Sequence, residues 1–318
     1  VVGLDTFLYE GCDFGRDEVP IAALRRDVRD VRPSELEGFD AVVHLAGLSN
    51  DPLGALDPEL TEEVNFRATV RLAETAKAAG VPRFLFASSC SMYGITGGDR
   101  PIDEAAPLKP LTAYAGSKAR AEDGLVHLAD TGFSPVLMRN ATAYGVSPRL
   151  RIDLVLNNLV GWAVTTGAVL ILSDGTPWRP LVHVRDIAAA TVALLEAPRE
   201  VVHCEAFNVG RDDENYQVRE LAEIARAAVG DCRIEYAGSG DPDSRSYRVD
   251  FGKLARVFPT LSLSWTAAAG ARELADAYRA DGMTIEEFES PRYTRLKRLQ
   301  ASLETGKLDS DLRWSVAV

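Results

Sequence analysis

Cysteine and histidine are scarce in this chain of 318 residues, which has four of each. The cysteines are far apart and form no C-x-x-C pair, and no histidine stands at a metal-ligand spacing. Neither a disulfide framework nor a zinc site is therefore expected. Thiols used this sparingly fit a reducing compartment, so the sequence predicts a cytoplasmic protein without a metal site.

Long hydrophobic runs and an excess of positive charge are also missing. No apolar run approaches the roughly 18 residues that cross a bilayer, which argues against a membrane span. Acidic residues number 47 against 35 basic ones, so the net charge is -12. Such a surface repels phosphate backbones and anionic lipid headgroups, and no basic patch compensates. Neither a nucleic acid nor a membrane is therefore an expected partner.

The composition is that of an ordinary globular protein, with 46% hydrophobic and 26% charged residues. Short apolar segments alternate with amphipathic ones in the first half of the chain. The segments expected as strands are 1–5, 21–24, 41–47, 83–88 and 134–139, and those expected as helices are 59–79 and 112–129. This alternation predicts an α/β fold with a doubly wound parallel sheet, the Rossmann architecture.

The pattern changes after Gly145, where strands become shorter and loops contain more proline, glycine and arginine. Helices are expected near residues 154–164 and 218–229. We therefore divide the chain into a dinucleotide-binding domain, residues 1–145, and a mainly substrate-binding α/β domain with C-terminal helices, residues 146–318. Residues 180–210 are expected to return to the first domain.

Tyr114 and Lys118 carry the strongest local signal for chemistry. Residues four apart on a helix project from the same face, so the ammonium can act on the phenol. A nearby ammonium lowers the pKa of a tyrosine from about 10 toward neutrality, which suits proton transfer with a carbinol. The alternative is a surface pair without function, which the spacing alone does not exclude.

A serine-rich turn, Ser-Ser-Cys-Ser-Met-Tyr-Gly, follows the expected strand at residues 88–94. Ligands of open α/β sheets sit beyond the carboxyl ends of such strands. Together with Tyr114 and Lys118, this turn resembles the extended short-chain dehydrogenase/reductases, the NAD-dependent epimerase/dehydratase family of nucleotide-sugar enzymes. The resemblance implies a catalytic triad of Ser89, Tyr114 and Lys118.

The same resemblance implies NAD as the cofactor. Asp5, at the end of its strand, matches the acid that binds the adenosine ribose and disfavours the extra phosphate of NADP. The other positions expected to contact NAD are Asp27 and Val28 at the adenine edge, Leu45, Ala46 and Gly47 beside the pyrophosphate, Lys118 at the ribose, and Thr142, where the family usually has asparagine.

One feature of the family is missing from this sequence. The Gly-x-x-Gly-x-x-Gly turn that receives the pyrophosphate should lie about 20 residues before the ribose-binding acid. Only four residues precede Asp5. We expect the first strand, the glycine loop and its helix to lie upstream of Val1. The alternative is a protein that does not bind NAD in the usual way.

Substrate contacts are also implied by the resemblance. Arg179 lies in a segment similar to the family's Arg-x-x-x-His-Val-x-Asp, and Arg245 matches its late phosphate-binding arginine. Two guanidinium groups would neutralise the pyrophosphate of a nucleotide-diphosphate sugar, the expected substrate. Asn157 and Asn158 would reach the sugar phosphate, and Ser91 the sugar. For each of these residues the alternative is a group without a binding role.

Cys90 and Ser91 distinguish between reactions of the family. In its 4,6-dehydratases these positions are usually Asp and Glu, which protonate a leaving hydroxyl and remove a neighbouring proton. A thiol and a serine are much weaker acids. The resemblance therefore favours an epimerase that acts through a transient ketosugar over a dehydratase or ketosugar reductase. Cys90 is either a catalytic substitute base or a small buried residue.

Two broader expectations concern function class and assembly. A non-catalytic dinucleotide-binding sensor or scaffold is the alternative from another class, and the intact triad argues against it. The segments Leu60 to Lys77 and Thr112 to Leu128 resemble the helices of a four-helix dimer contact, so a homodimer is expected. The C-terminal stretch has apolar residues at helical spacing from Phe288 to Leu303, which predicts packing on the second domain or on a neighbouring subunit.

Overall fold

The computed structural model describes residues 1–15, 21–49, 57–95, 100–237 and 245–315. Its strands are β1 (Gly3–Asp5), β2 (Ala23–Arg25), β3 (Ala41–His44), β4 (Arg83–Ser89), β5 (Ser134–Asn140), β6 (Thr142–Tyr144), β7 (Ala168–Ile171), β8 (Trp178–His183), β9 (Ala206–Val209), β10 (Asn215–Gln217) and β11 (Arg233–Tyr236). Its α-helices are α2 (Pro58–Glu62), α3 (Ala68–Ala78), α4 (Ala113–Leu128), α5 (Val155–Thr166), α6 (Val184–Glu196), α7 (Arg199–Val202), α8 (Val218–Val229), α9 (Gly252–Val257), α10 (Ala267–Asp281), α11 (Ile285–Phe288) and α12 (Arg295–Glu304). Shorter helical turns are η1 (Val28–Asp30), η2 (Pro33–Glu35), η3 (Glu63–Arg67), η4 (Cys90–Tyr93) and η5 (Asp212–Glu214).

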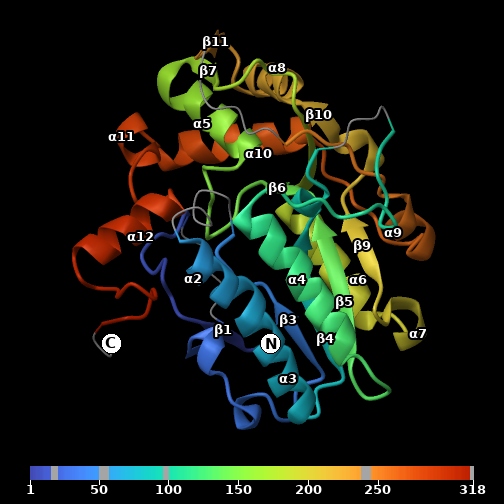
Figure 1. The fold of residues 1–318 in the computed structure, drawn as a ribbon. Coiled ribbons are helices and arrows are strands. Elements are labelled where there is room, and N and C mark those ends of the chain that lie inside the picture. Colours follow the sequence, from blue (N-terminus) through green and yellow to red (C-terminus); the bar gives the residue numbers. More distant parts are fainter. Residues whose placement is uncertain (16–20, 50–56, 96–99, 238–244, 316–318) are drawn as a thin grey trace.

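A parallel sheet in the order β3-β4-β5-β9 forms the centre of the molecule (Figure 1). Side chains of β4 alternate between two hydrophobic layers. Phe84 and Phe86 pack with residues of α3 and α4, whereas Leu85 packs with residues of α6 on the other face. Because both faces are covered, the strands are hydrophobic almost throughout. The expected α/β class with a parallel sheet is confirmed.

β1 and β2 form a separate parallel pair. Within the described ranges, no strand hydrogen-bonds this pair to β3. The second strand begins later than expected, at Ala23 rather than residue 21, and residues 45–47 leave β3 as a loop. The parallel strands β3 to β5 all end at one edge, and their carboxyl ends deliver the segments that build the candidate site.

The helical segment expected at 59–79 contains a turn of π-helix, η3, between α2 and α3. It begins at Pro58, where the missing amide proton costs nothing, and the Asp57 carboxylate caps the amide of Leu60. The wider turn of η3 carries Asn65, which is completely buried. A π-turn of this kind is often found at functional sites.

The second half of the chain has its own hydrophobic core, in which α5, α8 and α10 pack together. β7 pairs with β11, and β8 pairs with β6 on one side and β10 on the other. β9 returns to the central sheet beside β5. Figure 1 shows α5, α8 and α10 gathered above the carboxyl ends of the central strands.

The C-terminal stretch forms two helices instead of one continuous helix, because the chain leaves α11 just before Pro291. Phe288 of α11 belongs to the core of the second half. Leu299 of α12 packs instead with Leu48 and Leu60 of the first half. The two ends of this stretch therefore join both halves of the chain. None of the helices in the described ranges is long and apolar enough to span a bilayer.

Candidate active site

Lys118 lies in the second turn of α4 with its ammonium against the end of β4. Its Nζ donates to the carbonyl oxygen of Ala87 at 2.8 Å and lies 4.5 Å from the centre of the Phe86 ring. The residue is only 4% exposed. Burial lowers the pKa of Lys118 to about 8. The ammonium is therefore held where the parallel strands end, and the Glu122 carboxylate one turn further along α4 compensates its burial only in part.

Tyr114 occupies the first turn of α4, one helical turn before Lys118. The helix begins there because Thr112 caps it, its hydroxyl accepting the amide proton of Ala115 at 3.2 Å. Tyr114 is half-buried. Burial opposes the charge of Arg151, but Asp153 and also Tyr114 raise the pKa of this arginine. Tyr114 thus lies within electrostatic range of the Arg151 guanidinium.

Ser89 ends β4 and caps the short turn η4. Its hydroxyl accepts the amide proton of Ser91 at 3.2 Å and donates to the Ser91 hydroxyl at 2.9 Å. Ser89, Tyr114 and Lys118 therefore come from the end of one strand and the start of the next helix. Serine, phenol and ammonium in this arrangement can bind a carbinol oxygen and move its proton.

Cys90 points away from Ser89 and into the core. It has no exposed surface, and its thiol donates to the carbonyl oxygen of Arg139 at 3.0 Å. Burial raises the pKa of this thiol well above its ordinary value. A buried, protonated thiol is a poor general base, so the structure favours the second interpretation of Cys90, a small core residue closing the strand.

Asn140 ends β5 directly opposite Ser89 in the sheet register. Its Oδ1 is buried without a hydrogen-bond partner in the described structure. A buried acceptor left unpaired is costly, which suggests that a ligand pairs it. Thr142, two residues on, begins β6 and is half-buried. The sequence pattern singled out Thr142 and passed over Asn140, because the unpaired oxygen is visible only when β4 and β5 are side by side.

Leu45, Ala46 and Gly47 leave the end of β3 toward Lys118. Leu45 is 66% exposed, unusual for a large apolar residue. A Cβ on Gly47 would lie 3.0 Å from the side-chain oxygen of Asn65 and 3.8 Å from the Lys118 ammonium. The side chains of Asn65 and Lys118 occupy the space beside Gly47, so a larger residue there would crowd them.

Asn65 shapes this loop although the sequence pattern did not single it out. Its Oδ1 accepts the amide proton of Leu48 at 2.7 Å, and its Nδ2 donates to the Leu48 carbonyl oxygen at 3.0 Å. Both polar groups of a completely buried asparagine are thus used to fix the loop after β3. The only available signal was an amide side chain on the inner face of an amphipathic helix.

The three residues expected at the adenosine end occupy different environments. Asp5 is exposed at the end of β1, where its Oδ1 accepts the amide proton of Phe7 at 2.6 Å. Asp27 caps η1 and pairs with Arg29 at 2.6 Å; burial opposes its charge, but the bonds from Arg29 lower its pKa. Val28 packs in the core with residues of α3. Among these side chains, Asp5 is the most exposed.

The expected substrate residues divide into two groups. Arg179 is 8% exposed and donates to the backbone carbonyl of Arg245, so β8 brings these two arginines together. The amides of Asn157 and Asn158 bond the loop before α5 instead. Asn157 accepts the amide proton of Gly145 at 3.0 Å, and Asn158 donates to the carbonyl oxygen of Ile152 at 3.1 Å. Their geometry supports a role in shaping this loop.

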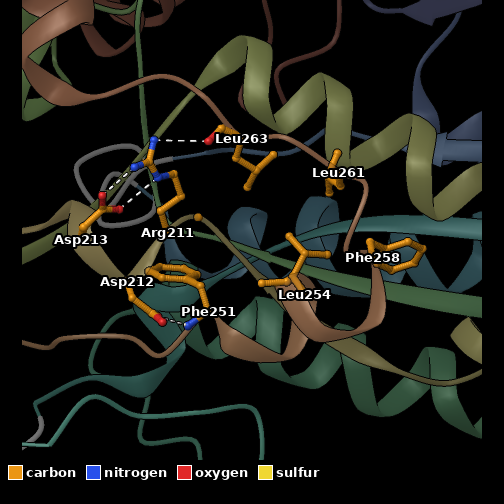
Figure 2. Close-up of a pocket in the computed structure, with 10 residues that line it drawn as sticks. Arg211, Asp212, Asp213, Phe251, Leu254, Phe258, Leu261 and Leu263 are labelled. Atoms are coloured by element: carbon orange, nitrogen blue, oxygen red, sulfur yellow. Dashed lines mark hydrogen bonds and ion pairs between the residues drawn. The ribbon is translucent and has the colours of Figure 1, made fainter.

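A cavity of about 280 Å³ lies beyond the end of β9 (Figure 2). Its apolar wall includes Phe251, Leu254 and Phe258. Figure 2 shows Arg211 at its edge, paired with Asp213 at 2.5 Å and donating to the carbonyl oxygen of Leu263 at 3.2 Å. None of the lining residues coincides with a residue expected from the sequence to bind cofactor or substrate. The described residues also hold no cluster of His, Cys, Asp or Glu placed for a metal ion.

The model of the NAD dependent epimerase/dehydratase family matches residues 14–210, more than half of the chain. The chain belongs to this family. Its members are enzymes that use NAD, so the resemblance seen in the sequence is confirmed.

Individual relatives agree with this assignment. Human UDP-glucose 4-epimerase is 31% identical over 255 residues, which cover 73% of this chain and 70% of the human protein. UDP-glucose 4-epimerase of Bacillus subtilis is 26% identical over 309 residues, or 91% of this chain and 86% of that protein. The structure of MoeE5 in complex with UDP-glucose and NAD is 25% identical with a TM-score of 0.74, covering 89% of this chain and 91% of MoeE5.

Proposed function

We propose that this protein is an NAD-dependent nucleotide-sugar epimerase that acts through a transient ketosugar. The observation that carries the proposal is the position of the buried Lys118 ammonium. The ammonium bonds the carbonyl oxygen of Ala87, which lies on β4 two residues before Ser89. Tyr114 lies one helical turn before Lys118 on α4. A sensor or scaffold would gain nothing from this costly charge.

In the proposed reaction, Tyr114 as phenolate removes the proton of a sugar hydroxyl while Ser89 hydrogen-bonds the reacting oxygen. Lys118 stabilises the phenolate and holds the cofactor's ribose. Held by Asp5, Gly47 and Lys118, NAD would supply the hydride chemistry that interconverts the sugar and its ketosugar. Tyr114 then gives its proton back to the oxygen. The sequence of steps inverts one carbon and consumes neither cofactor nor water.

The described residues fit the cofactor at several points. Gly47 lies beside the Lys118 ammonium, Asn140 offers an unpaired acceptor, and Asp5 is an exposed carboxylate at a strand end. We propose that residues 1–145 hold the dinucleotide and that Asp5 selects NAD over NADP, because a carboxylate repels the additional phosphate. Residues 146–318 would hold most of the nucleotide sugar, with Arg179 and Arg245 neutralising its pyrophosphate.

Epimerisation is preferred over dehydration because the turn after Ser89 offers no carboxylic acid. Cys90 is buried and the hydroxyl of Ser91 bonds Ser89. Neither can protonate a leaving hydroxyl at neutral pH. Relatives named as 4-epimerases act on UDP-glucose or UDP-glucuronate, and we propose a nucleotide hexose of this kind as the substrate class.

The test is incubation of the purified protein with NAD and a panel of nucleotide hexoses in heavy water, followed by mass spectrometry and NMR. A product of unchanged mass, inverted at one carbon and without carbon-bound deuterium, is expected. The Tyr114→Phe variant serves as the matched control and should give none. Loss of one water would identify a dehydratase, and accumulation of oxidised or reduced sugar a one-way enzyme. Cofactor binding without conversion of any sugar would support the sensor.

We further propose that the protein works in the cytoplasm as a homodimer. The helical segment α2-η3-α3 and helix α4 pack side by side and carry charged residues on their outer surface, among them Arg120 paired with Glu62. A second copy of this pair of helices would complete a four-helix contact. Light scattering should therefore give twice the mass of the chain. A monomer mass at every concentration would contradict the proposal.

A further inference from the structure

The last described residues of the chain form a compact reverse turn, the C-terminal turn (residues 307–315). The amide of Asp309 donates to the carbonyl oxygen of Arg313 at 2.9 Å. The Asp309 carboxylate in turn accepts the amide protons of Asp311 at 2.9 Å and Arg313 at 2.8 Å. Leu312 is buried in a hydrophobic cluster shared with residues of the first half. The C-terminal turn is therefore a fixed part of the fold.

Trp314 of this turn contacts the peptide group that directly follows Asp5. Its indole Nε1 donates to the carbonyl oxygen of Thr6 at 2.7 Å. The N–H of the same peptide group, which belongs to Phe7, donates to Oδ1 of Asp5 at 2.6 Å. Because the C=O and N–H of a trans peptide point in opposite directions, this peptide lies between the indole and the carboxylate. The two hydrogen bonds strengthen each other and fix its orientation.

The backbone of Phe7 needs such support. Its φ of 56° lies in the left-handed region, which is unfavourable for a residue with a side chain. Conformations of this kind persist where the surroundings impose them, and they are concentrated at functional sites. Here Trp314 fixes the preceding carbonyl, and the Arg25 guanidinium lies 4.7 Å from the centre of the Phe7 ring. The turn after Asp5 is therefore held by contacts from outside it.

This arrangement leaves one oxygen of Asp5 for a ligand. Oδ1 accepts the Phe7 amide proton, whereas Oδ2 accepts no hydrogen bond from the residues that the structure describes. The residue is exposed. A carboxylate held through one oxygen keeps the other in a constant place, and recognition of a ribose hydroxyl requires such a fixed acceptor.

A second connection leads from the C-terminal turn to Asp27, the carboxylate expected at the adenine edge. The carbonyl oxygen of Asp311 accepts a hydrogen bond from Nη1 of Arg29 at 2.9 Å. The same guanidinium bonds Asp27 through Nε at 2.9 Å and Nη2 at 2.6 Å. Burial opposes the charge of Asp27, but Arg29 and also Arg313 lower its pKa. The C-terminal turn is thus connected to both carboxylates expected at the adenosine end.

We propose that Trp314 is a positioning residue for the cofactor, because its indole fixes the peptide that holds the Asp5 carboxylate for a ribose hydroxyl of NAD. The C-terminal turn then contributes to the choice between NAD and NADP, since a carboxylate in a fixed place excludes the additional phosphate most effectively. This inference rests on the proposed function in requiring that Asp5 binds the adenosine ribose.

The test is calorimetric titration of NAD and of NADP with the full-length protein freed of nucleotide. Trp314→Phe keeps an aromatic ring but removes the N–H. It should weaken NAD binding about 3- to 10-fold, the range for one lost hydrogen bond, and leave NADP binding unchanged, so that selectivity for NAD falls. Trp162→Phe is the matched control, because Trp162 is half-buried against Phe288 in the second half. It should bind both dinucleotides like the parent.

A double-mutant cycle shows whether Trp314 acts through Asp5. Trp314→Phe introduced into an Asp5→Ala background should change NAD binding less than about twofold, because no carboxylate remains to be positioned. A loss of NAD affinity as large as in the parent background would show that the indole acts elsewhere, and it would overturn the inference.

The remaining outcomes separate the possible failures. Unchanged NAD selectivity in a folded Trp314→Phe variant overturns the inference and leaves the proposed function intact. Equal weakening of NAD and NADP binding would show that Trp314 only holds the fold, which also overturns it. A parent protein that binds neither dinucleotide would contradict the proposed function itself. If Trp314→Phe lowers the melting temperature, replacement of Trp314 by benzothienylalanine, an isostere with sulfur in place of the N–H, keeps the packing and should show the same loss of selectivity.

Discussion

Lys118 of α4 and Arg139 of β5 are both buried cations, but their surroundings differ. Arg139 pairs with Glu122 at 2.7 Å and also donates to the Tyr93 hydroxyl at 3.1 Å and to the Glu104 carbonyl oxygen at 3.0 Å. Lys118 has one carbonyl acceptor and an aromatic face, and the same Glu122 carboxylate acts on its charge without forming an ion pair with it. A buried charge with all its bonds made stabilises a unique arrangement, whereas an under-compensated one marks a site awaiting a ligand. The comparison assigns a structural role to Arg139 and a functional role to Lys118.

The largest expected effect is a loss of turnover when Lys118 or its neighbour Tyr114 is replaced. Lys118→Met and Tyr114→Phe should each reduce turnover by about 10²- to 10⁴-fold, because each removes one part of the acid-base pair. Lys118→Met should keep or raise the melting temperature, since it removes a buried charge. The double variant should be little worse than either single one if the two residues act as a unit. Turnover and calorimetric melting check both statements.

A fall in stability without loss of turnover per folded molecule would reverse the assignment of Lys118. In that case the ammonium would be a structural group like Arg139. The pH dependence of turnover is a second test of the role of Lys118, because the ammonium is needed in its charged form. With its pKa at about 8, turnover should decline as the pH rises above 8.

The second-largest effect is expected on the stability of the protein when Arg139 is replaced. Arg139→Met leaves the Glu122 carboxylate buried and without its partner, which should cost about 3–5 kcal/mol of unfolding free energy. The double variant Arg139→Met with Glu122→Leu should recover much of this loss, because no unpaired charge remains. Urea denaturation measures both. A single variant as stable as the parent would show that water reaches Glu122.

Which of these residues could be predicted from the sequence depends on how far apart in the chain the interacting residues lie. Tyr114 and Lys118 were predictable because four residues on a helix determine a shared face, and the strand ends followed from hydrophobic patterning. The unpaired oxygen of Asn140 and the loop contacts of Asn65 depend on which strands and helices become neighbours. Trp314 reaches Thr6 across most of the chain. No local pattern carries that information.

His44 provides a smaller effect that depends on pH. It is buried behind Lys118, bonds the Thr69 hydroxyl at 2.9 Å, and has a pKa lowered by burial to about 3. Below pH 6.5 the unfolded chain therefore binds a proton on His44, whereas the folded chain leaves His44 neutral. The free energy of unfolding falls by about 1.4 kcal/mol for each pH unit below that value.

His44→Gln lacks this titration and isolates it from the carboxylates that also protonate in acid. The stability advantage of the parent over the variant should shrink by about 2–3 kcal/mol between pH 6.5 and 4.5. Chemical denaturation at several pH values measures the difference. A constant difference would mean that His44 is protonated in the fold, and its proximity to Lys118 would then add a second uncompensated cation to the site.

The smallest expected effect concerns Cys90, which precedes both cations in the sequence. Its thiol bonds the carbonyl oxygen of Arg139, so we expect Cys90, like Arg139, to have a structural role. Cys90→Ala should lower stability by about 1 kcal/mol through one lost weak bond and a little lost packing, and turnover should change less than about twofold.

The native protein should also resist alkylation at Cys90, because the thiol is inaccessible and protonated. Peptide mapping after treatment with iodoacetamide distinguishes it from Cys204 and Cys232, which are half-buried. A large loss of turnover in a stable Cys90→Ala variant, or rapid alkylation that substrate prevents, would place the thiol in the reaction. The absence of a carboxylic acid after Ser89 would then no longer disfavour the elimination of water.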